Sequence, residues 1–200
     1  MSAMQNPRNT KIRKISLIGK GWSSYIWLAE AKTGAKKIRC VVKEVREKSP
    51  RKNLAEREGK FLKLANSASV GPKIILADEK NNFVAMEFIK GKSLLNWILE
   101  SGEKNSQKIS KKQLYYFIKE LYKQLLALDS VHLSHNQLQV GKNILVQKNG
   151  RNYFPAIIDF EKATLKEKTK NIGQIESFLF YNPNGAVAKK VREILNVRLC

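Results

Sequence analysis

The sequence contains little cysteine, and what there is does not suggest cross-links. Only Cys40 and Cys200 occur among the 200 residues. Cys40 lies within an apolar strand pattern and Cys200 ends the chain, so we expect neither a disulfide between them nor a cysteine metal site. The N-terminal residues also lack the apolar segment of a signal peptide, which together with reduced thiols predicts a cytoplasmic protein.

Long apolar runs are missing as well. No stretch approaches the roughly 20 apolar residues that a bilayer-spanning helix needs, so we expect no membrane association. Hydrophobic residues still make up 42% of the chain. Over 200 residues this is enough for a real core, in one large domain or in two small lobes.

Acidic residues are scarce, because 38 Lys and Arg oppose 17 Asp and Glu and leave a formal net charge of +21. A field of this sign attracts polyanions such as RNA or nucleotide phosphates. The basic residues are spread along the whole chain, which argues against a specific nucleic-acid motif. We therefore expect non-specific contact with RNA or a ribonucleoprotein rather than recognition of a base sequence.

The stretch from residue 143 to 161 organises the rest of the chain. Two apolar runs flank the turn sequence Lys148-Asn149-Gly150-Arg151, and Asn-Gly between such runs predicts a β-hairpin. Asn143 precedes the first strand and Asp159 follows the second, so the hairpin brings both to one end. Two hard oxygen ligands there suit Mg²⁺, although Asn and Asp at strand ends are also ordinary turn residues.

A glycine turn lies between the first two expected strands, residues 14–18 and 25–30. Gly19 and Gly21 are spaced by one residue, so the backbone there can approach a phosphate closely and point N–H groups at it. The same spacing also marks ordinary hairpins. Because no helix follows, the turn is neither a dinucleotide-binding fingerprint nor a P-loop.

Lys43 lies in the third strand, residues 37–45, and alternation places it on one face with apolar neighbours. A solvated surface lysine is the ordinary alternative. On an apolar face, however, the ammonium needs an anionic partner. The following helix, residues 51–66, turns Glu58 inward, and Glu56 is the alternative if the helix is rotated.

The remaining pattern predicts an α+β protein with a five-stranded antiparallel sheet. Two strands, residues 73–78 and 83–89, complete that sheet, and a short helix follows the Gly91-Lys92-Ser93 sequence. A long helix capped by Ser110 carries an apolar stripe. Two final helices are expected over residues 171–181 and 186–199.

This order of elements resembles the protein-kinase fold, with an N-lobe of residues 1–90 and a reduced, mainly helical C-lobe of residues 91–200. The resemblance implies that Gly19 and Gly21 cover the phosphates of ATP, that Lys43 contacts them and that Glu58 pairs with Lys43. It implies also that a hinge meets the adenine. The hinge residues are Met86, Glu87, Phe88 and Ile89.

The second half carries counterparts of the catalytic loop and of the metal-binding segment. The His135-Asn136-Gln137-Leu138 sequence is similar to the H-R-D-L loop, with Asn143 as the loop asparagine and Asp159 as the metal-binding aspartate, so that both hold Mg²⁺. Two departures matter: Gln137 replaces the catalytic aspartate, and the loop is one residue longer. Lys142 near the γ-phosphate and Glu161 as a substitute carboxylate are hypotheses from proximity in sequence.

The short C-lobe is similar in size to the RIO kinases and the small kinase of the KEOPS complex. The D-F-E-K-A sequence from Asp159 to Ala163 and the altered loop resemble a small archaeal group of predicted serine/threonine kinases. The resemblance implies an ATP-dependent phosphotransferase with a protein hydroxyl, its own included, as acceptor. A nucleotide-binding pseudokinase scaffold on RNA or a ribonucleoprotein is the alternative, and a small-molecule kinase is a third.

Overall fold

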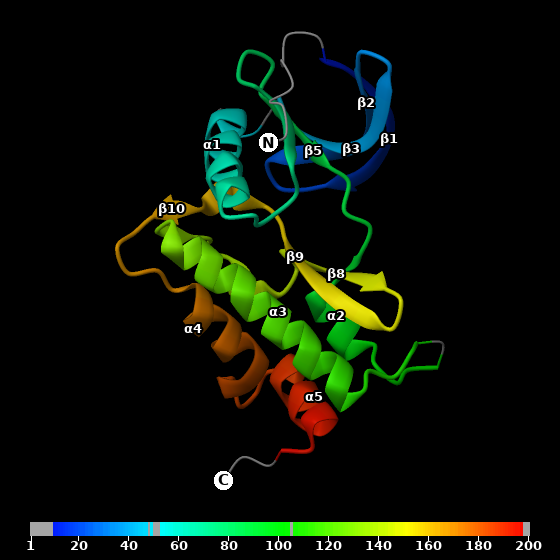
Figure 1. Ribbon diagram of the computed structural model, residues 1–200, viewed down its shortest axis with the longest axis vertical. Helices are drawn as coiled ribbons and strands as arrows, with labels where there is room; N and C mark the ends of the chain where they lie inside the picture. Colours follow the sequence, from blue (N-terminus) through cyan, green and yellow to red (C-terminus); the bar gives the residue numbers. More distant parts are fainter. Residues whose placement is uncertain (1–9, 48, 50–52, 105, 198–200) are drawn as a thin grey trace.

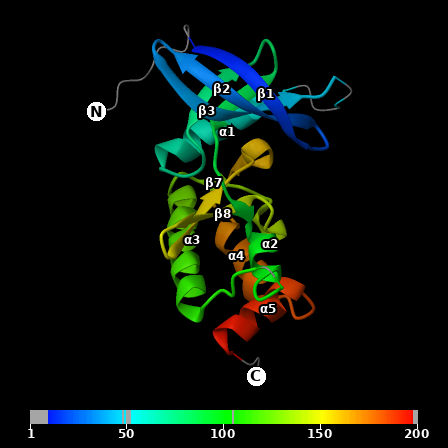
Figure 2. The ribbon, with the colours of Figure 1, turned by 90° about the vertical axis from the view of Figure 1, so that its right-hand side faces the viewer.

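The computed structural model describes residues 10–47, 49, 53–104 and 106–197 and has an α+β fold. An antiparallel sheet with one helix against it forms one end of the molecule, and helices with two small sheets form the other (Figure 1). The view turned by 90° shows the same division, with the larger sheet at the top and α5, Ala186–Leu195, at the bottom (Figure 2).

The larger sheet has five strands in the order β1-β2-β3-β5-β4, all antiparallel, as the sequence predicted. Its strands include β-branched residues, and their side chains alternate between an apolar cluster on one face of the sheet and a cavity on the other. Their bounds are β1 Thr10–Lys20, β2 Ser24–Thr33, β3 Lys36–Val45, β4 Ile74–Asp78 and β5 Phe83–Glu87.

The other end is built around α3, which carries the long apolar stripe. Ser110 and Gln113 form a capping box at its start, with the Ser110 Oγ accepting from the Gln113 N–H at 3.2 Å. The helices are α2 Leu94–Leu99, α3 Lys111–Ser130, α4 Asn171–Glu176, the π-helical turn η4 Ser177–Tyr181 and α5 Ala186–Leu195. The short strands and turns are β6 Lys92–Ser93, β7 Leu133–Ser134, η2 Leu138–Val140, β8 Ile144–Asn149, β9 Asn152–Ile157, η3 Phe160–Lys162 and β10 Thr164–Leu165.

One apolar core runs through both ends of the molecule. Most residues of the predicted apolar stripe of α3 are buried, among them Leu114, Phe117 and Leu121, whereas Ile118 is half-buried. Helix α1, Leu54–Ser67, joins the same core and packs closely on β4 at Gly59, where an added Cβ would lie 2.8 Å from the Ala77 Cβ. The missing side chain at Gly59 therefore sets how near α1 comes to the sheet.

Several predicted details differ from the structure. The hairpin turn is shifted by one residue, because Asn149 pairs with Asn152 and the loop is Gly150-Arg151. Only Gly150 of this turn has a positive φ, 59°. The last helix ends at Leu195, where Asn196 takes a left-handed conformation, and the expected helix over 171–181 becomes π-helical from Ser177.

The structure also bears on the predictions about the cysteines and about membrane-spanning helices. Cys40 is buried with a free thiol whose pKa burial and Glu30 raise to about 11, and Cys200 lies outside the described residues. In the described part of the chain, no helix combines the length and the apolarity needed to cross a bilayer.

Candidate functional site

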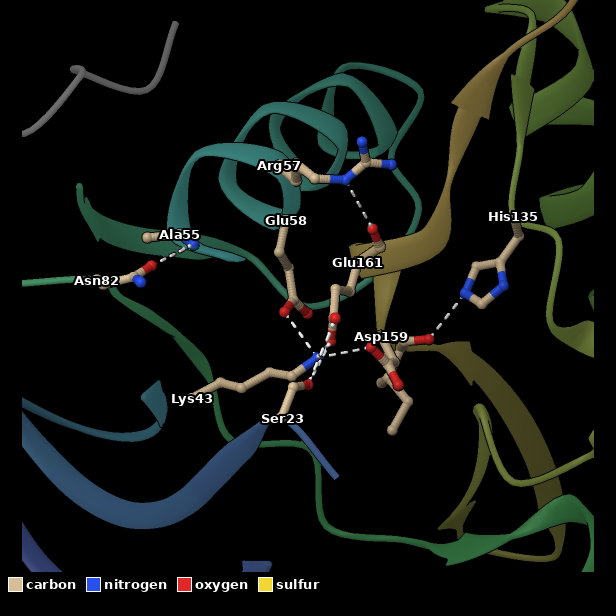
Figure 3. A network of polar contacts seen from close by, with 10 residues as sticks. Ser23, Lys43, Ala55, Arg57, Glu58, Asn82, His135, Asp159 and Glu161 are labelled. Carbon is tan, nitrogen blue, oxygen red and sulfur yellow. Dashed lines mark hydrogen bonds and ion pairs between the residues drawn. The ribbon is translucent and has the colours of Figure 1, made fainter. Parts of the chain in front are cut away.

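A buried lysine surrounded by three carboxylates lies where the sheet meets the rest of the molecule. The Nζ of Lys43, on β3, lies 2.8 Å from the Glu58 Oε2, 2.6 Å from the Asp159 Oδ1 and 3.3 Å from the Glu161 Oε2 (Figure 3). Strand alternation turns Lys43 toward α1, and the helical period turns Glu58 toward β3. The structure therefore brings Lys43 and Glu58 together, while Glu56 is exposed.

Burial and ion pairing act in opposite directions on these groups. Burial disfavours the charged ammonium of Lys43, but Glu58 and Asp159 outweigh it, so the pKa of Lys43 is raised. Burial raises the pKa of Glu58, which is fully enclosed, against the lowering effect of Lys43. Asp159 is less enclosed, and Lys43 holds its pKa below the usual range although burial opposes this.

Glu161 connects this cluster to the glycine turn. The Ser23 hydroxyl, at the end of that turn, donates to the Glu161 carboxylate with distances of 3.3 and 3.4 Å to its two oxygens. The Arg57 Nε of α1 donates to the Glu161 carbonyl at 3.4 Å. From the sequence, Glu161 was considered only as a replacement for the missing catalytic carboxylate. Its position two residues after Asp159 is the feature from which its contact with Lys43 could have been predicted.

A cavity of about 340 Å³ opens beside the cluster. Its wall includes Lys43, Glu58 and Asp159 together with apolar side chains from the sheet and from the β8–β9 hairpin. The full set is Ile18, Ile26, Val41, Lys43, Glu58, Pro72, Met86, Glu87, Phe88, Ile89, Lys142, Asn143, Leu145, Ile158 and Asp159. The cavity is thus apolar over much of its wall and charged at one end, which is typical of a small-molecule site.

Most residues singled out from the sequence line this cavity. Met86, Glu87, Phe88 and Ile89 do so where the chain leaves β5. Gly19, Gly21 and Gln137 do not. The two glycines lie just beyond it, since Ile18 and Ile26 line the cavity and Gly19 pairs with Ile26.

Asn143 and Asp159 lie at the same end of the β8–β9 hairpin, as its pairing requires. The Ile158 N–H donates to the Asn143 carbonyl at 2.9 Å, which joins the two segments directly. The Asn143 Nδ2 donates to the Gln137 carbonyl at 3.3 Å, so the amide oxygen is turned away from that carbonyl. Asp159 has a φ of 66°, a left-handed conformation that is unusual for a residue other than glycine.

The loop that carries His135 and Gln137 is held by side chains that sequence reasoning missed. The His135 N–H donates to the Asn171 Oδ1 at 2.9 Å, and the Leu138 N–H donates to the Gln174 Oε1 at 3.0 Å. The Asn171 Nδ2 in turn donates to the Asp129 Oδ1 at 2.7 Å. These partners lie far along the chain and follow no motif spacing, so the sequence alone gives no signal for them.

His135 is buried and is a donor at one ring nitrogen. Its Nε2 lies 2.9 Å from the Ile158 carbonyl, which can only accept, so Nε2 carries the proton. Burial lowers the pKa of His135, and its ring meets Phe160 edge to face at 5.0 Å between centroids. His135 therefore supports the segment before Asp159 and does not line the cavity.

The loop between Gln137 and Asn143 takes a left-handed conformation at Gly141. Its φ is 63°, and an added Cβ would lie 2.2 Å from the Phe178 Cζ. Phe178 belongs to the π-helical turn η4. The loop and η4 therefore fit together only with glycine at this position.

The oxygen ligands of the site suit a divalent cation in two ways. Ligand atoms of Glu58, Asp159 and Glu161 lie within 4.8 Å of one another, but the Lys43 ammonium already contacts all three. Asn143 and Asp159 both line the cavity and offer the amide and carboxylate oxygens that Mg²⁺ prefers. The second pair fits the cation better, because both of its members line the cavity, whereas Glu161 of the first set does not.

Comparison with known proteins relates this chain to an archaeal protein. It is 34% identical over 112 residues to the "uncharacterized protein MJ1211" of Methanocaldococcus jannaschii, a match that covers 56% of this chain and 84% of the relative. The chain therefore belongs to the same family as that protein. No family model matches the chain.

Proposed function

We propose that the protein is an ATP-dependent phosphotransferase with a two-lobed, kinase-like arrangement, acting in the cytoplasm. The sheet with α1 is the N-lobe of residues 1–90, and the helical part is the C-lobe of residues 91–200. One observation carries the proposal: the Lys43 ammonium meets Glu58 of its own part of the molecule and Asp159 of the other, beside a cavity of about 340 Å³. Phosphate groups of a nucleotide require such a cation.

The two ends of the cavity suit the two ends of ATP. Val41, Met86 and Leu145 offer an apolar surface for a flat ring, and the backbone from Glu87 to Ile89 passes beside it. At the other end, Lys43 and Asp159 supply charge. The wall thus matches an adenine at one end and phosphates at the other.

The chain's own residues have separate tasks in this proposal. Lys43 binds the α- and β-phosphates and stays attached to Glu58, because two charged partners limit its movement. Asn143 and Asp159, which both line the cavity, would hold Mg²⁺. The cation compensates phosphate charge when bound. Gly19 and Gly21 cover the phosphates, and the Ser23–Glu161 contact holds the end of their turn.

Gln137 limits how a hydroxyl acceptor reacts. The resemblance to kinases predicts a Ser or Thr hydroxyl of a protein, its own included, as the acceptor. An amide orients such a hydroxyl but does not take its proton, and general-base assistance is worth roughly 10²- to 10⁴-fold. Nucleotide binding does not depend on that assistance, so binding and transfer are tested separately.

The test measures ATP binding by calorimetry and transfer from γ-labelled ATP with Mg²⁺, using the full chain. Lys43→Ala and Asp159→Ala should each abolish transfer, and Lys43→Ala should also weaken ATP binding at least about tenfold, the loss of one charged contact. Lys37→Ala, on the exposed part of the same strand, is the matched control. If ATP binds no better to the unaltered protein than to Lys43→Ala, the proposal is wrong.

A scaffold that binds a nucleotide without transferring phosphate is the second candidate. The net charge of +21 favours it, because a partner such as RNA or a ribonucleoprotein would be attracted to the whole surface. Binding to RNA should then weaken steeply as salt rises from 50 to 200 mM, concentrations over which phosphate contacts are typically lost. Nucleotide binding without any transfer would favour this candidate over the first.

A further inference from the structure

Among the described residues, the cavity has no carboxylate that is placed to take a proton from an acceptor. Glu58, Glu87 and Asp159 are the acidic residues on its wall. Glu58 and Asp159 are both ion-paired with Lys43, and in the proposed function Asp159 would also hold Mg²⁺. Glu87 is exposed at the other end of the cavity and accepts from the Lys73 N–H at 3.2 Å.

Other candidate bases are engaged elsewhere. Glu161 is buried, contacts Ser23 and Lys43, and does not line the cavity. The Nε2 of His135 donates to the Ile158 carbonyl, and this ring too is absent from the wall. Gln137, whose backbone carbonyl accepts from the Asn143 Nδ2, has an amide side chain, which is not a base. A hydroxyl acceptor would therefore react without a base.

A second cation faces the same end of the cavity. Lys142 lines the wall and directly precedes Asn143, so the hairpin places it at the Asp159 end. Its side chain is exposed, and no carboxylate of the described residues lies within ion-pair distance of its ammonium. Lys43 is already assigned to the nucleotide. Lys142 is therefore available for a second anion.

We propose that the acceptor in this site is a phosphate monoester rather than a hydroxyl, and that Lys142 binds it. The inference rests on the proposed phosphotransferase function. A phosphate monoester carries nearly two negative charges at pH 7, because its second pKa is about 6, so its oxygen attacks without losing a proton. The strongly positive chain favours a polynucleotide as the carrier of this dianion, because a polynucleotide is itself a polyanion, and a phosphorylated peptide is the other outcome of the test.

The reaction balances without a base. An acceptor phosphate oxygen forms a bond to the γ-phosphorus of ATP, and the bond from that phosphorus to the β–γ bridging oxygen breaks. The bond electrons remain on ADP, and the product is a diphosphate ester. No proton is released above the second pKa of the acceptor, whereas transfer to a neutral hydroxyl must release one.

Matched acceptors test the proposal with the full chain, γ-labelled ATP and Mg²⁺. One pair is an oligoribonucleotide with a 5′-phosphate or a 5′-hydroxyl, and the other is a peptide with phosphoserine or serine. We expect at least about 100-fold faster transfer to the phosphorylated member, matching the assistance that a missing base would give a hydroxyl. The pair that reacts identifies the source of the phosphate.

Two variants separate acceptor binding from nucleotide binding. Lys142→Ala should raise the KM for the phosphorylated acceptor at least about tenfold, since it removes one charged contact, and should weaken ATP binding less than this. Lys142→Arg should restore most of the loss. Lys119→Ala removes the same charge from the exposed face of α3 and is the matched control.

The outcomes are distinct from those of the proposed function. Faster transfer to the hydroxyl members, or proton release equal to ADP formation in a weakly buffered solution, overturns the phosphate acceptor while the phosphotransferase remains. ATP binding without transfer to any of the four also overturns it. Lack of ATP binding by the unaltered protein removes the proposed function and this inference together. Transfer to a phosphorylated member without proton release supports it.

Discussion

The interior of the molecule has two regions of different kind. One is the charged cluster around Lys43, and the other is the apolar stripe of α3. The stripe is fully enclosed and carries no charge, so its stabilising effect comes from removing apolar surface from water. The cluster encloses one ammonium with three carboxylates, whose desolvation opposes their attraction. The first interior accounts for stability, and the second is better explained by a function.

Lys43→Ala should have the largest effect of the changes considered. It leaves Glu58 enclosed without its cation, and breaking a buried pair in this way costs about 3–5 kcal/mol of the free energy of unfolding. Urea unfolding measures the loss. Lys37→Ala, whose ion pair with Glu30 is exposed, should cost less than about 1 kcal/mol. Equal losses of unfolding free energy for the two variants would contradict the conclusion that Glu58 depends on Lys43 for its charge compensation.

Leu121→Ala tests the other interior. Leu121 is fully buried in α3, so the change should cost about 2–5 kcal/mol through lost burial and a cavity. ATP binding at a temperature where the variant is folded should be unchanged, because Leu121 does not line the cavity. Weaker ATP binding by the folded variant would show that the two interiors are coupled.

Gly141→Ala tests the loop before β8, which lies between the charged cluster and the helical core. Both Gly141 and Gly150 have positive φ, 63° and 59°, but only Gly141 would place its Cβ against Phe178. The backbone strain is therefore similar, about 1–2 kcal/mol, and the contact with Phe178 adds to it only at Gly141. Thermal unfolding should show a larger loss for Gly141→Ala than for Gly150→Ala. A smaller loss would contradict the contact.

The free energy of unfolding should depend on pH through the charged cluster and not through the apolar stripe, whose side chains do not titrate. Asp159 has a lowered pKa in the folded protein, so between that value and 3.8 only the unfolded chain binds the proton. The free energy of unfolding therefore falls as the pH drops through this range, and Asp159→Asn should flatten that slope in urea titrations.

Glu58 provides a check of opposite sign. Its raised pKa means that the folded protein holds the proton more tightly than the unfolded chain, so it loses stability as the pH rises above 4.5. Glu58→Gln should remove this loss. The same direction of change in both variants would contradict the electrostatic account.

Local patterns in the sequence were enough to predict much of the fold and part of the site. Alternation in the third strand and the helical period after it predicted Glu58 as the partner of Lys43, with Glu56 as the alternative, and the structure has Glu58 there. The hairpin signal brought Asn143 and Asp159 to one end, although its turn was misplaced by one residue. These relations depend on short-range geometry, which the order of residues specifies directly.

Contacts between distant segments were not predictable in the same way. Asn171 reaches the His135 backbone only because α4 packs beside the loop, and nothing in its own neighbourhood marks it. The contact of Glu161 with Ser23 likewise depends on how the sheet lies against η3. Such contacts follow from tertiary packing, which residue spacing does not encode.

Phe160 lies between Asp159 and Glu161 and is completely enclosed. Its ring meets His135 on one side and approaches Gly71 on another, where an added Cβ would lie 2.9 Å from it. Moving this ring would open a void and would displace both neighbouring carboxylates with it. The enclosed ring therefore fixes the backbone on both sides of it, and with it the two positions from which the Asp159 and Glu161 carboxylates reach Lys43.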